Sequence, residues 1–123
     1  MASSVRKVNL AKKFAQIPDI YSPRLVGEVN DCAVKLSKVL GDFVWHKHDN
    51  EDELFLVTKG KLTIKLRDGN VALGPGEFAI IPRGVEHCPV SEEETHVVLF
   101  EPKTTLNTGD VRNERTVDEL DWV

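Results

Sequence analysis

Short segments of alternating apolar and polar residues occupy most of the chain between residues 25 and 101. The clearest is 61–67, where Leu62, Ile64 and Leu66 fall on one face and lysine, threonine and arginine side chains fall on the other. Because successive side chains of a strand point to opposite faces, this pattern predicts β-strands. We predict strands over residues 25–29, 32–40, 43–48, 54–58, 61–67, 70–73, 77–82, 85–90 and 95–101.

Turn-forming residues separate these segments. Asp68-Gly69 is typical of a tight hairpin, and Lys59-Gly60 is suited to a tight turn between its flanking strands. Further turns are expected at Gly74-Pro75-Gly76, at Pro82-Arg83-Gly84 and in the acidic stretch 91–94. About eight to ten short strands joined by such turns predict an all-β sandwich or barrel.

The helical period appears near the N-terminus only. In residues 9–17, Leu10, Phe14 and Ile17 share one helical face, Asn9 is suited to cap the N-terminus, and Pro18 ends the pattern. After residue 102 the chain is rich in Thr, Asn and Gly, which predicts an irregular tail. Its last residues, 117–123, fit either a short helical turn or a docked strand.

Length and composition exclude several classes of protein. The chain has 123 residues, of which 41% are hydrophobic and 29% charged, as expected of one soluble globular domain. The net charge is −4 with no basic cluster, which argues against nucleic acid as a partner. The apolar runs fall short of the roughly 18 residues of a membrane span, and no signal peptide is apparent. Cys32 and Cys88 suggest reduced thiols and, by default, a cytoplasmic protein.

Two histidines at strand spacing are the first candidate for chemistry. His46 and His48 lie two residues apart, so on a strand both imidazoles project from one face. Glu53 would return beside them if the next strand is antiparallel, and His87 begins a later strand after a Pro-x-Gly turn. Each of these residues alone is more often surface polarity or packing. Together they offer three nitrogens and one oxygen, and an octahedral ion would keep two open positions.

The spacing of these residues resembles that of the cupins. Their first motif is a glycine, five residues, His-x-His, three or four residues, a glutamate, six residues and a glycine. In this chain Gly41 is followed after four residues by His46-x-His48, then after four by Glu53 and after six by Gly60. The first glycine is therefore one residue closer than the pattern, a departure that affects a turn and not the ligands.

The second cupin motif is a glycine, five residues, Pro-x-Gly, two residues, a histidine, three residues and an asparagine. Here Gly76 is followed by Pro82-x-Gly84, His87 and, in place of the asparagine, Ser91. The serine puts one motif-closing hydrogen bond in doubt. The two motifs together cover residues 41–91.

The resemblance implies a double-stranded β-helix, that is, a jelly-roll or cupin barrel, with a short N-terminal helix. It implies an extension over 1–29, a barrel over 30–101 and a tail over 102–123. It also implies a divalent transition metal, Fe, Mn, Ni, Zn or Cu, and no organic cofactor. The implied ligands are His46, His48, Glu53 and His87.

Four further residues are candidates for the surroundings of the ion. Phe55 and Val57 share the inward face of the Glu53 strand and would line an apolar pocket, although plain barrel core explains each equally well. His96 is more often a packed or surface histidine than a pocket residue. Arg83 is suited to meet an anionic substrate at the barrel mouth, but a solvated turn charge is the simpler interpretation.

Outward-facing apolar residues suggest an interface. Phe43 and Trp45 are expected on the face opposite His46, where they would be exposed. With Leu54 and Leu56 they would pack against the N-terminal segment or against a second subunit, which makes a homodimer.

Three functional hypotheses remain open. The first is a metal-dependent enzyme acting on a small molecule, since cupins include dioxygenases, sugar-type isomerases and epimerases, and short members are often described as mannose-6-phosphate isomerase-like. The second is a non-catalytic module that binds or senses a small ligand. The third is a scaffold without metal. The sequence shows no general base, phosphate cradle or nucleophile, so catalytic residues and reaction stay unassigned.

Overall fold

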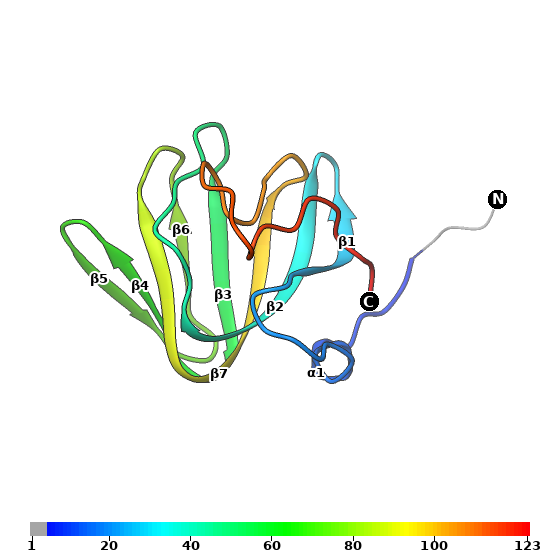
Figure 1. Ribbon diagram of the computed structural model, residues 1–123. Coiled ribbons are helices and arrows are strands. Elements are labelled where there is room, and N and C mark those ends of the chain that lie inside the picture. The colour runs from blue at the N-terminus through cyan, green and yellow to red at the C-terminus, as the bar shows by residue number, and fades with distance from the viewer. Residues whose placement is uncertain (1–4) are drawn as a thin grey trace.

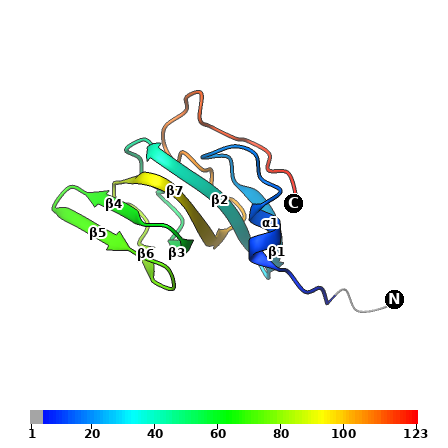
Figure 2. The same cartoon turned by 90° about the horizontal axis from the view of Figure 1, so that it is seen from below.

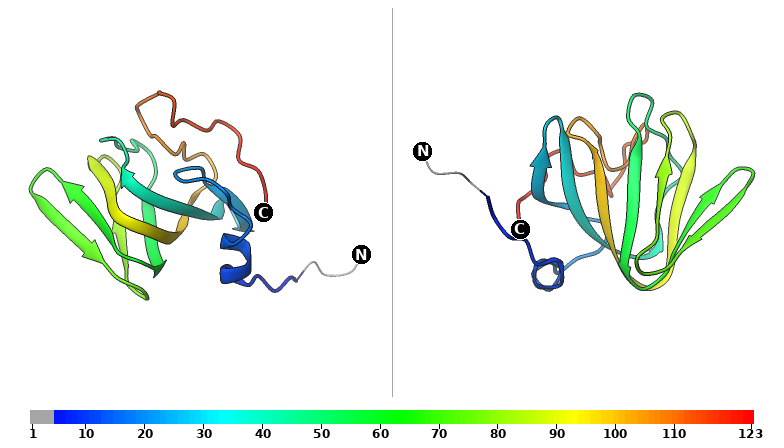
Figure 3. Two further views of the ribbon diagram at one scale, coloured as in Figure 1. Left: turned by 60° about the horizontal axis from the view of Figure 1, so that its bottom comes forward. Right: turned by 180° about the vertical axis from the view of Figure 1, so that it is seen from behind.

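A computed structural model describes residues 5–123 and shows a β-barrel with one short helix within that range (Figure 1). Its strands form one antiparallel sheet in the order β1-β2-β7-β3-β6, with the hairpin β4–β5 joined to β7. The sheet rolls up into a barrel (Figure 3), which confirms the predicted double-stranded β-helix. The elements are α1 (Leu10–Phe14), β1 (Arg24–Val29), β2 (Cys32–Asp42), β3 (Glu53–Lys59), β4 (Leu62–Leu66), β5 (Gly69–Leu73), β6 (Phe78–Ile81) and β7 (His87–Pro102).

Strand β7 runs without interruption through the stretch where we predicted an acidic turn, so that prediction is wrong. Its first half pairs with β4, its second half pairs with β3, and β2 accompanies both halves. Val39 faces Thr95 and Gly41 faces Ser91, so three acidic residues oppose a single β2 residue. The acids bulge outward into solvent, which bends the strand from one half of the barrel to the other.

The predicted strand over 43–48 is also wrong, because the segment makes only one β-bridge, between His46 and His87. The amide of Phe43 donates to the carbonyl of Pro89 at 2.9 Å, and His46 and His87 exchange two bonds at 3.0 and 2.9 Å. The three residue steps from Phe43 to His46 therefore lie opposite only two steps on β7, from Pro89 to His87. The extra residue breaks the alternation and brings Phe43 to the inner side with His46, whereas Trp45 stays outside beneath the Arg67 guanidinium.

Two glycine turns have different roles. The hairpin predicted at Asp68-Gly69 is confirmed, since Leu66 and Gly69 pair where β4 meets β5. The turn at Gly60 instead carries the chain between β3 and β4, which are not neighbours in the sheet. Gly60 has φ +89°, and a Cβ there would collide with Oγ1 of Thr95. Only glycine fits this crossing.

The barrel has an inner and an outer apolar cluster. The inner cluster fills the barrel and includes Phe55, Val57, Leu62 and Ile64. The outer cluster covers the back of the sheet, where α1 lies against β2 (Figure 2). Phe14 of α1 is almost fully buried there, together with Leu36 of β2 and Val98 of β7.

The N-terminal helix is confirmed, although it is shorter than its pattern. The side chain of Asn9 accepts a hydrogen bond from the amide of Lys12 at 3.0 Å, as a capping residue does. The helix ends at Phe14, yet Ile17 still reaches the outer cluster. Leu56 packs against the same cluster. Of the two partners predicted for this residue, the N-terminal segment and a second subunit, the N-terminal segment therefore covers it.

The C-terminal tail is irregular, as predicted, and passes along one end of the barrel (Figures 1 and 3). Trp122 forms a parallel bridge with Leu25, and the amide of Val123 donates to the carbonyl of Leu25 at 3.0 Å. Of the two alternatives for the end of the chain, the docked strand is therefore correct. The division into 1–29, 30–101 and 102–123 stays a prediction. None of the helices within residues 5–123 has the length and apolar character needed to cross a membrane.

Candidate metal centre and its cavity

Four side chains from three parts of the chain meet inside one end of the barrel. Each offers one ligand atom, and these atoms all lie within 4.8 Å of one another. All four residues are buried, with exposed fractions of 0–4%. We call them the His–Glu cluster: His46, His48, Glu53 and His87.

Local backbone pairing explains why the cluster forms. The bridge between His46 and His87 sets their rings side by side, with centroids 4.3 Å apart. The amide of Gly84 donates to the carbonyl of His48 at 2.8 Å, which ties the Pro-x-Gly turn to the other histidine segment. Glu53 is the first residue of β3 and faces inward. Backbone hydrogen bonds between the two motif segments therefore hold the cluster residues together.

Backbone carbonyls fix the orientation of two imidazoles. Nδ1 of His46 lies 2.8 Å from the carbonyl of Val44, and Nδ1 of His87 lies 2.9 Å from that of Val85. Because a carbonyl oxygen only accepts, each Nδ1 carries the proton. The Nε2 atoms of both histidines therefore present lone pairs to the cluster.

Within residues 5–123, the lone pairs inside the cluster face no positively charged partner. Nε2 of His87 and Nε2 of His48 each lie 3.3 Å from Oε1 of Glu53. Both ring nitrogens of His48 are buried and make no hydrogen bond within the described chain. Such unpaired polar atoms are costly inside a protein. A divalent cation accepts three nitrogens and one carboxylate oxygen, so these residues fit a transition metal.

His46 and Glu53 hold the protonation states that bind metals. Burial, assisted by the neighbouring His87, lowers the pKa of His46 from 6.5 to about 4, so this imidazole is neutral near pH 7. Burial alone would raise the pKa of Glu53, but a hydrogen bond from the Glu101 carboxyl group and the neighbouring His48 and His87 imidazoles hold it well below its usual value. Neutral imidazoles and an ionised carboxylate are the ligand forms that a cation requires.

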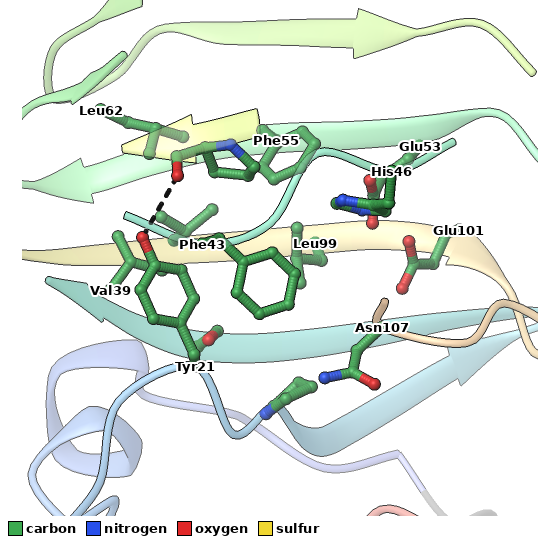
Figure 4. Close-up of a pocket in the computed structure, with 14 residues that line it drawn as sticks. Tyr21, Val39, Phe43, His46, Glu53, Phe55, Leu62, Leu99, Glu101 and Asn107 are labelled. Atoms are coloured by element: carbon green, nitrogen blue, oxygen red, sulfur yellow. Dashed lines mark hydrogen bonds between the residues drawn. The ribbon is translucent and has the colours of Figure 1, made fainter. Parts of the chain in front are cut away.

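A cavity of about 40 Å³ opens beside the cluster, with an apolar end and a polar end (Figure 4). Tyr21, Phe43 and Leu62 lie toward the apolar end. His46 and Glu53 face the polar end, and Glu101 lies beside them. The cluster therefore has access to a small space for a ligand, lined mainly by hydrocarbon.

A buried ion pair stands next to the cluster. Nζ of Lys35 lies 2.7 Å from Oε2 of Glu101, and the two side chains are 3% and 2% exposed. Burial and the nearby carboxylate of Glu53 raise the pKa of Glu101, while the ammonium of Lys35 opposes that rise. The second oxygen of Glu101, Oε1, meets no nitrogen or hydroxyl donor in the described chain, and a side-chain hydrogen bond with Glu53 adds to the rise in pKa.

Sequence reasoning missed three residues of this site. Lys35 and Glu101 lie on stretches of β2 and β7, residues 32–39 and 95–102, where both faces are buried or half-buried, and a charge within such a stretch was the available signal. Gly109 belongs to the tail, where a Cβ would collide with the carbonyl of Lys47 and lie 2.9 Å from Cδ2 of His46. No pattern in the sequence indicated that the tail touches a cluster histidine.

Of the other four candidate residues, Phe55 alone is among the residues that line the cavity. Val57 is fully buried in the inner cluster without lining it. His96 stacks on Phe14, with ring centroids 4.4 Å apart, at the outer cluster. The side chain of Arg83 is exposed, and the backbone amide of this residue donates to Asp52 at 2.8 Å.

Ser91, which replaces the motif asparagine, is buried and makes its own closing contacts. Its Oγ lies 2.9 Å from the carbonyl of Lys61 and 2.7 Å from Oγ1 of Thr95. The hydrogen bond left in doubt by the sequence is thus replaced by a contact to the crossing after Gly60.

Comparison with known proteins places this geometry among cupin domains. The Cupin_2 model, described as a cupin domain, matches residues 38–102. The uncharacterized protein YdbB of Bacillus subtilis (strain 168) is 40% identical over 79 residues, which cover 63% of this chain and 70% of that protein.

Two solved structures share both fold and sequence with the chain. A cupin-2 domain containing protein from Shewanella frigidimarina NCIMB 400 is 45% identical, with a TM-score of 0.77 over 78% of this chain and 94% of its own. Protein NMB1881 from Neisseria meningitidis is 29% identical, with a TM-score of 0.73 over 80% of this chain and 100% of its own.

Proposed function

The chain belongs to the cupin family, as a Cupin_2 member, and we propose that it binds or transforms a small molecule at a divalent metal held by the His–Glu cluster. The observation that carries this proposal is the set of four ligand atoms within 4.8 Å of one another. Their lone pairs face each other without hydrogen-bond donors to separate them, which a cation would correct.

The chain supplies the protein half of such a centre. His46, His48 and His87 would donate Nε2, and Glu53 would donate a carboxylate oxygen. The ion could be Fe, Mn, Ni, Zn or Cu, because mixed nitrogen and oxygen ligands do not select among them. When bound, such an ion polarises an oxygen of a ligand or supports redox chemistry. The carbonyls of Val44 and Val85 keep two of the imidazoles in the correct tautomer for this role.

Metal analysis of protein purified without a histidine tag tests the proposal. We expect close to one transition metal per chain in the wild type and loss of most of it in Glu53→Gln and His87→Ala. His96→Ala is the matched control, because it removes an imidazole outside the cluster. Equal metal content in all four proteins, or none in the wild type, would refute the proposal.

A substrate panel separates a binding module from an enzyme. Dioxygenase and mannose-6-phosphate isomerase-like chemistry would both use the same ion, with and without O₂ respectively. Turnover by metal-loaded protein that is absent from the Glu53→Gln variant would indicate catalysis. Saturable binding of a ligand without turnover would indicate the sensing role.

An exposed apolar edge supports a homodimer. Phe78 and Ile80 of the edge strand β6 are 59% and 55% exposed, and they pair with Leu56 and Leu54 on the same outer face of the sheet. A second copy docking on this face would bury that apolar surface. We expect a dimer mass by light scattering and a monomer for Ile80→Lys. A monomer mass for the wild type at every concentration would refute the dimer.

Cys32 and Cys88 are both free thiols, which supports a reducing compartment and therefore the cytoplasm. Fractionation of cells that express the untagged chain tests this assignment. Recovery in an oxidising compartment would refute it.

A further inference from the structure

A second cavity adjoins the His–Glu cluster. It has a volume of about 200 Å³ and lies between residues 47–51 and residues 104–110, the first part of the tail. We call this cavity the seam. Its lining includes exposed residues, such as Asp49 and Asp110, and also His48, which is only 4% exposed. Because His48 belongs to the cluster as well, the seam joins solvent to a cluster residue.

The charges of the seam favour cations. Its lining in the described chain contains three carboxylates and one ammonium, from Asp49, Glu51, Asp110 and Lys47. Nζ of Lys47 already lies 3.2 Å from a carboxylate oxygen of Asp49. An excess of negative charge at a narrow opening raises the local concentration of cations. The cavity of about 40 Å³ on the barrel interior is smaller and lined mainly by hydrocarbon, so a hydrated cation reaches the cluster more easily through the seam.

His48 is the least restrained imidazole of the cluster. Its Nε2 lies 3.3 Å from Oε1 of Glu53, and its Nδ1 is buried without a hydrogen-bond partner in the described chain. The rings of His46 and His87 are instead each held by a backbone carbonyl. An imidazole without such a hydrogen bond turns at less cost. The cluster residue that lines the seam is therefore also the one best able to move as an ion passes.

Three hydrogen bonds join the two walls of the seam within the described chain. Oδ1 of Asp110 accepts from the amide of Lys47 at 2.9 Å, and the amide of Asp110 donates to the carbonyl of Lys47 at 3.0 Å. The hydroxyl of Thr104 donates to Oε2 of Glu51 at 2.8 Å. Neither apolar cluster of the described chain includes a residue from 104–110. The walls can therefore separate without disturbing the core of the barrel.

We propose that the seam is the route by which a metal ion reaches and leaves the His–Glu cluster, with His48 at its inner end and residues 104–110 as a strap that closes it. The inference rests on the proposed function, because it requires a metal at the cluster. It gives the tail, which continues beyond the matched cupin segment 38–102, a role in the rate of metal exchange.

Thr104→Val tests the strap. The substitution removes the hydroxyl that donates to Glu51 and keeps the shape of the side chain. Stopped-flow mixing of the full chain with zinc gives the rate of uptake, and transfer of zinc to excess chelator gives the rate of release. We expect both rates to rise about two- to fivefold, the ratio for one hydrogen bond of ordinary strength, with an unchanged dissociation constant. Thr104→Ser is the matched control, because it keeps the hydroxyl and should keep the wild-type rates.

Asp110→Asn tests the charge of the seam. It removes a negative charge but keeps an oxygen that can accept from the amide of Lys47. We expect zinc uptake to slow about two- to threefold at low ionic strength, and this difference should disappear in high salt, which screens the attraction. Glu92→Gln is the control, because it removes one exposed carboxylate outside the seam.

The outcomes separate this inference from the proposed function. A wild-type chain that binds no zinc refutes both. A chain that binds zinc, with equal rates in Thr104→Val and Thr104→Ser, refutes the inference alone. Faster release without faster uptake in Thr104→Val would assign the tail to support of the ligands and would also refute it. Equal uptake by Asp110→Asn and Glu92→Gln would refute the seam as the route, and this comparison stands even if Thr104→Val does not fold.

Discussion

Nε2 of His87 lies 3.3 Å from Oε1 of Glu53, and the proton of this imidazole is already committed to the carbonyl of Val85. Two lone pairs thus face each other in a site that excludes water. Such an arrangement is unfavourable without a positive charge between the atoms, whether a proton or a metal ion supplies it.

Metal-free protein should lose stability as the pH falls from about 6.5 to about 4. The pKa of His46 is about 4 in the folded chain and about 6.5 when the chain is unfolded, so the unfolded state takes up the proton first. The contribution is complete above pH 6.5 and decreases by about 1.4 kcal/mol per pH unit below it. Urea denaturation in the presence of a chelator should show this slope, and His46→Gln should flatten it by about one proton. Identical slopes would contradict the burial of a neutral His46.

Gly109→Ala should weaken metal binding although residue 109 is not a ligand. A Cβ at this position would collide with the carbonyl of Lys47 and lie 2.9 Å from the ring of His46. The imidazole must shift, and disturbance of a ligand's support typically costs about 10–100-fold in affinity. Competition with a chelator measures the change. Gly74→Ala is the control, since its Cβ would make only an ordinary contact at 3.5 Å; equal affinities in the two variants would disprove the contact.

Lys35→Met should destabilise the protein by about 3–5 kcal/mol, because it leaves the carboxylate of Glu101 buried without its partner. The double variant Lys35→Met/Glu101→Met should recover most of that loss, since it removes the unpaired charge as well. Urea denaturation of both variants at one pH gives the two free energies of unfolding. Equal destabilisation of the single and double variants would show that the ion pair is not the cause.

Gly60→Ala should cost more stability than Gly41→Ala. Both glycines have positive φ, +89° and +76°, so both variants pay for backbone strain of about 1–3 kcal/mol. Only at Gly60 would the new Cβ also meet backbone, 2.9 Å from Cα of Thr95, whereas nothing lies within 4 Å at Gly41. Thermal denaturation of the two variants isolates the contact. If they are equally stable, the crossing from β3 to β4 is less crowded than the structure indicates.

The barrel and the residues of the cluster could be predicted from the sequence because they depend on short-range spacing. The interval between His46 and His48, and the Pro-x-Gly turn before His87, are local features that survive without knowledge of strand pairing. The alternation in β2, β3 and β4 is likewise visible within each segment.

What failed depends on pairing between distant segments. Phe43 turns inward only because three residue steps on its segment match two on β7, a register that the segment itself does not encode. The acidic stretch 91–94 looks like a turn but bulges from a long strand held by β2. The burial of Lys35 and of Glu101 is understood only from the ion pair between them, which joins residues 66 positions apart in the sequence. The need for a glycine at position 109 is understood only from the path of the tail, which brings this residue against Lys47 and His46.

Anomalous diffraction from crystals of the zinc-loaded chain tests the central claim most directly. Our account predicts one strong peak inside the barrel, about 2.0–2.2 Å from Nε2 of three histidines and from a carboxylate oxygen of Glu53. A peak at His96 or on the surface with none in the cluster would contradict it, as would a cluster that stays without zinc at saturating concentration.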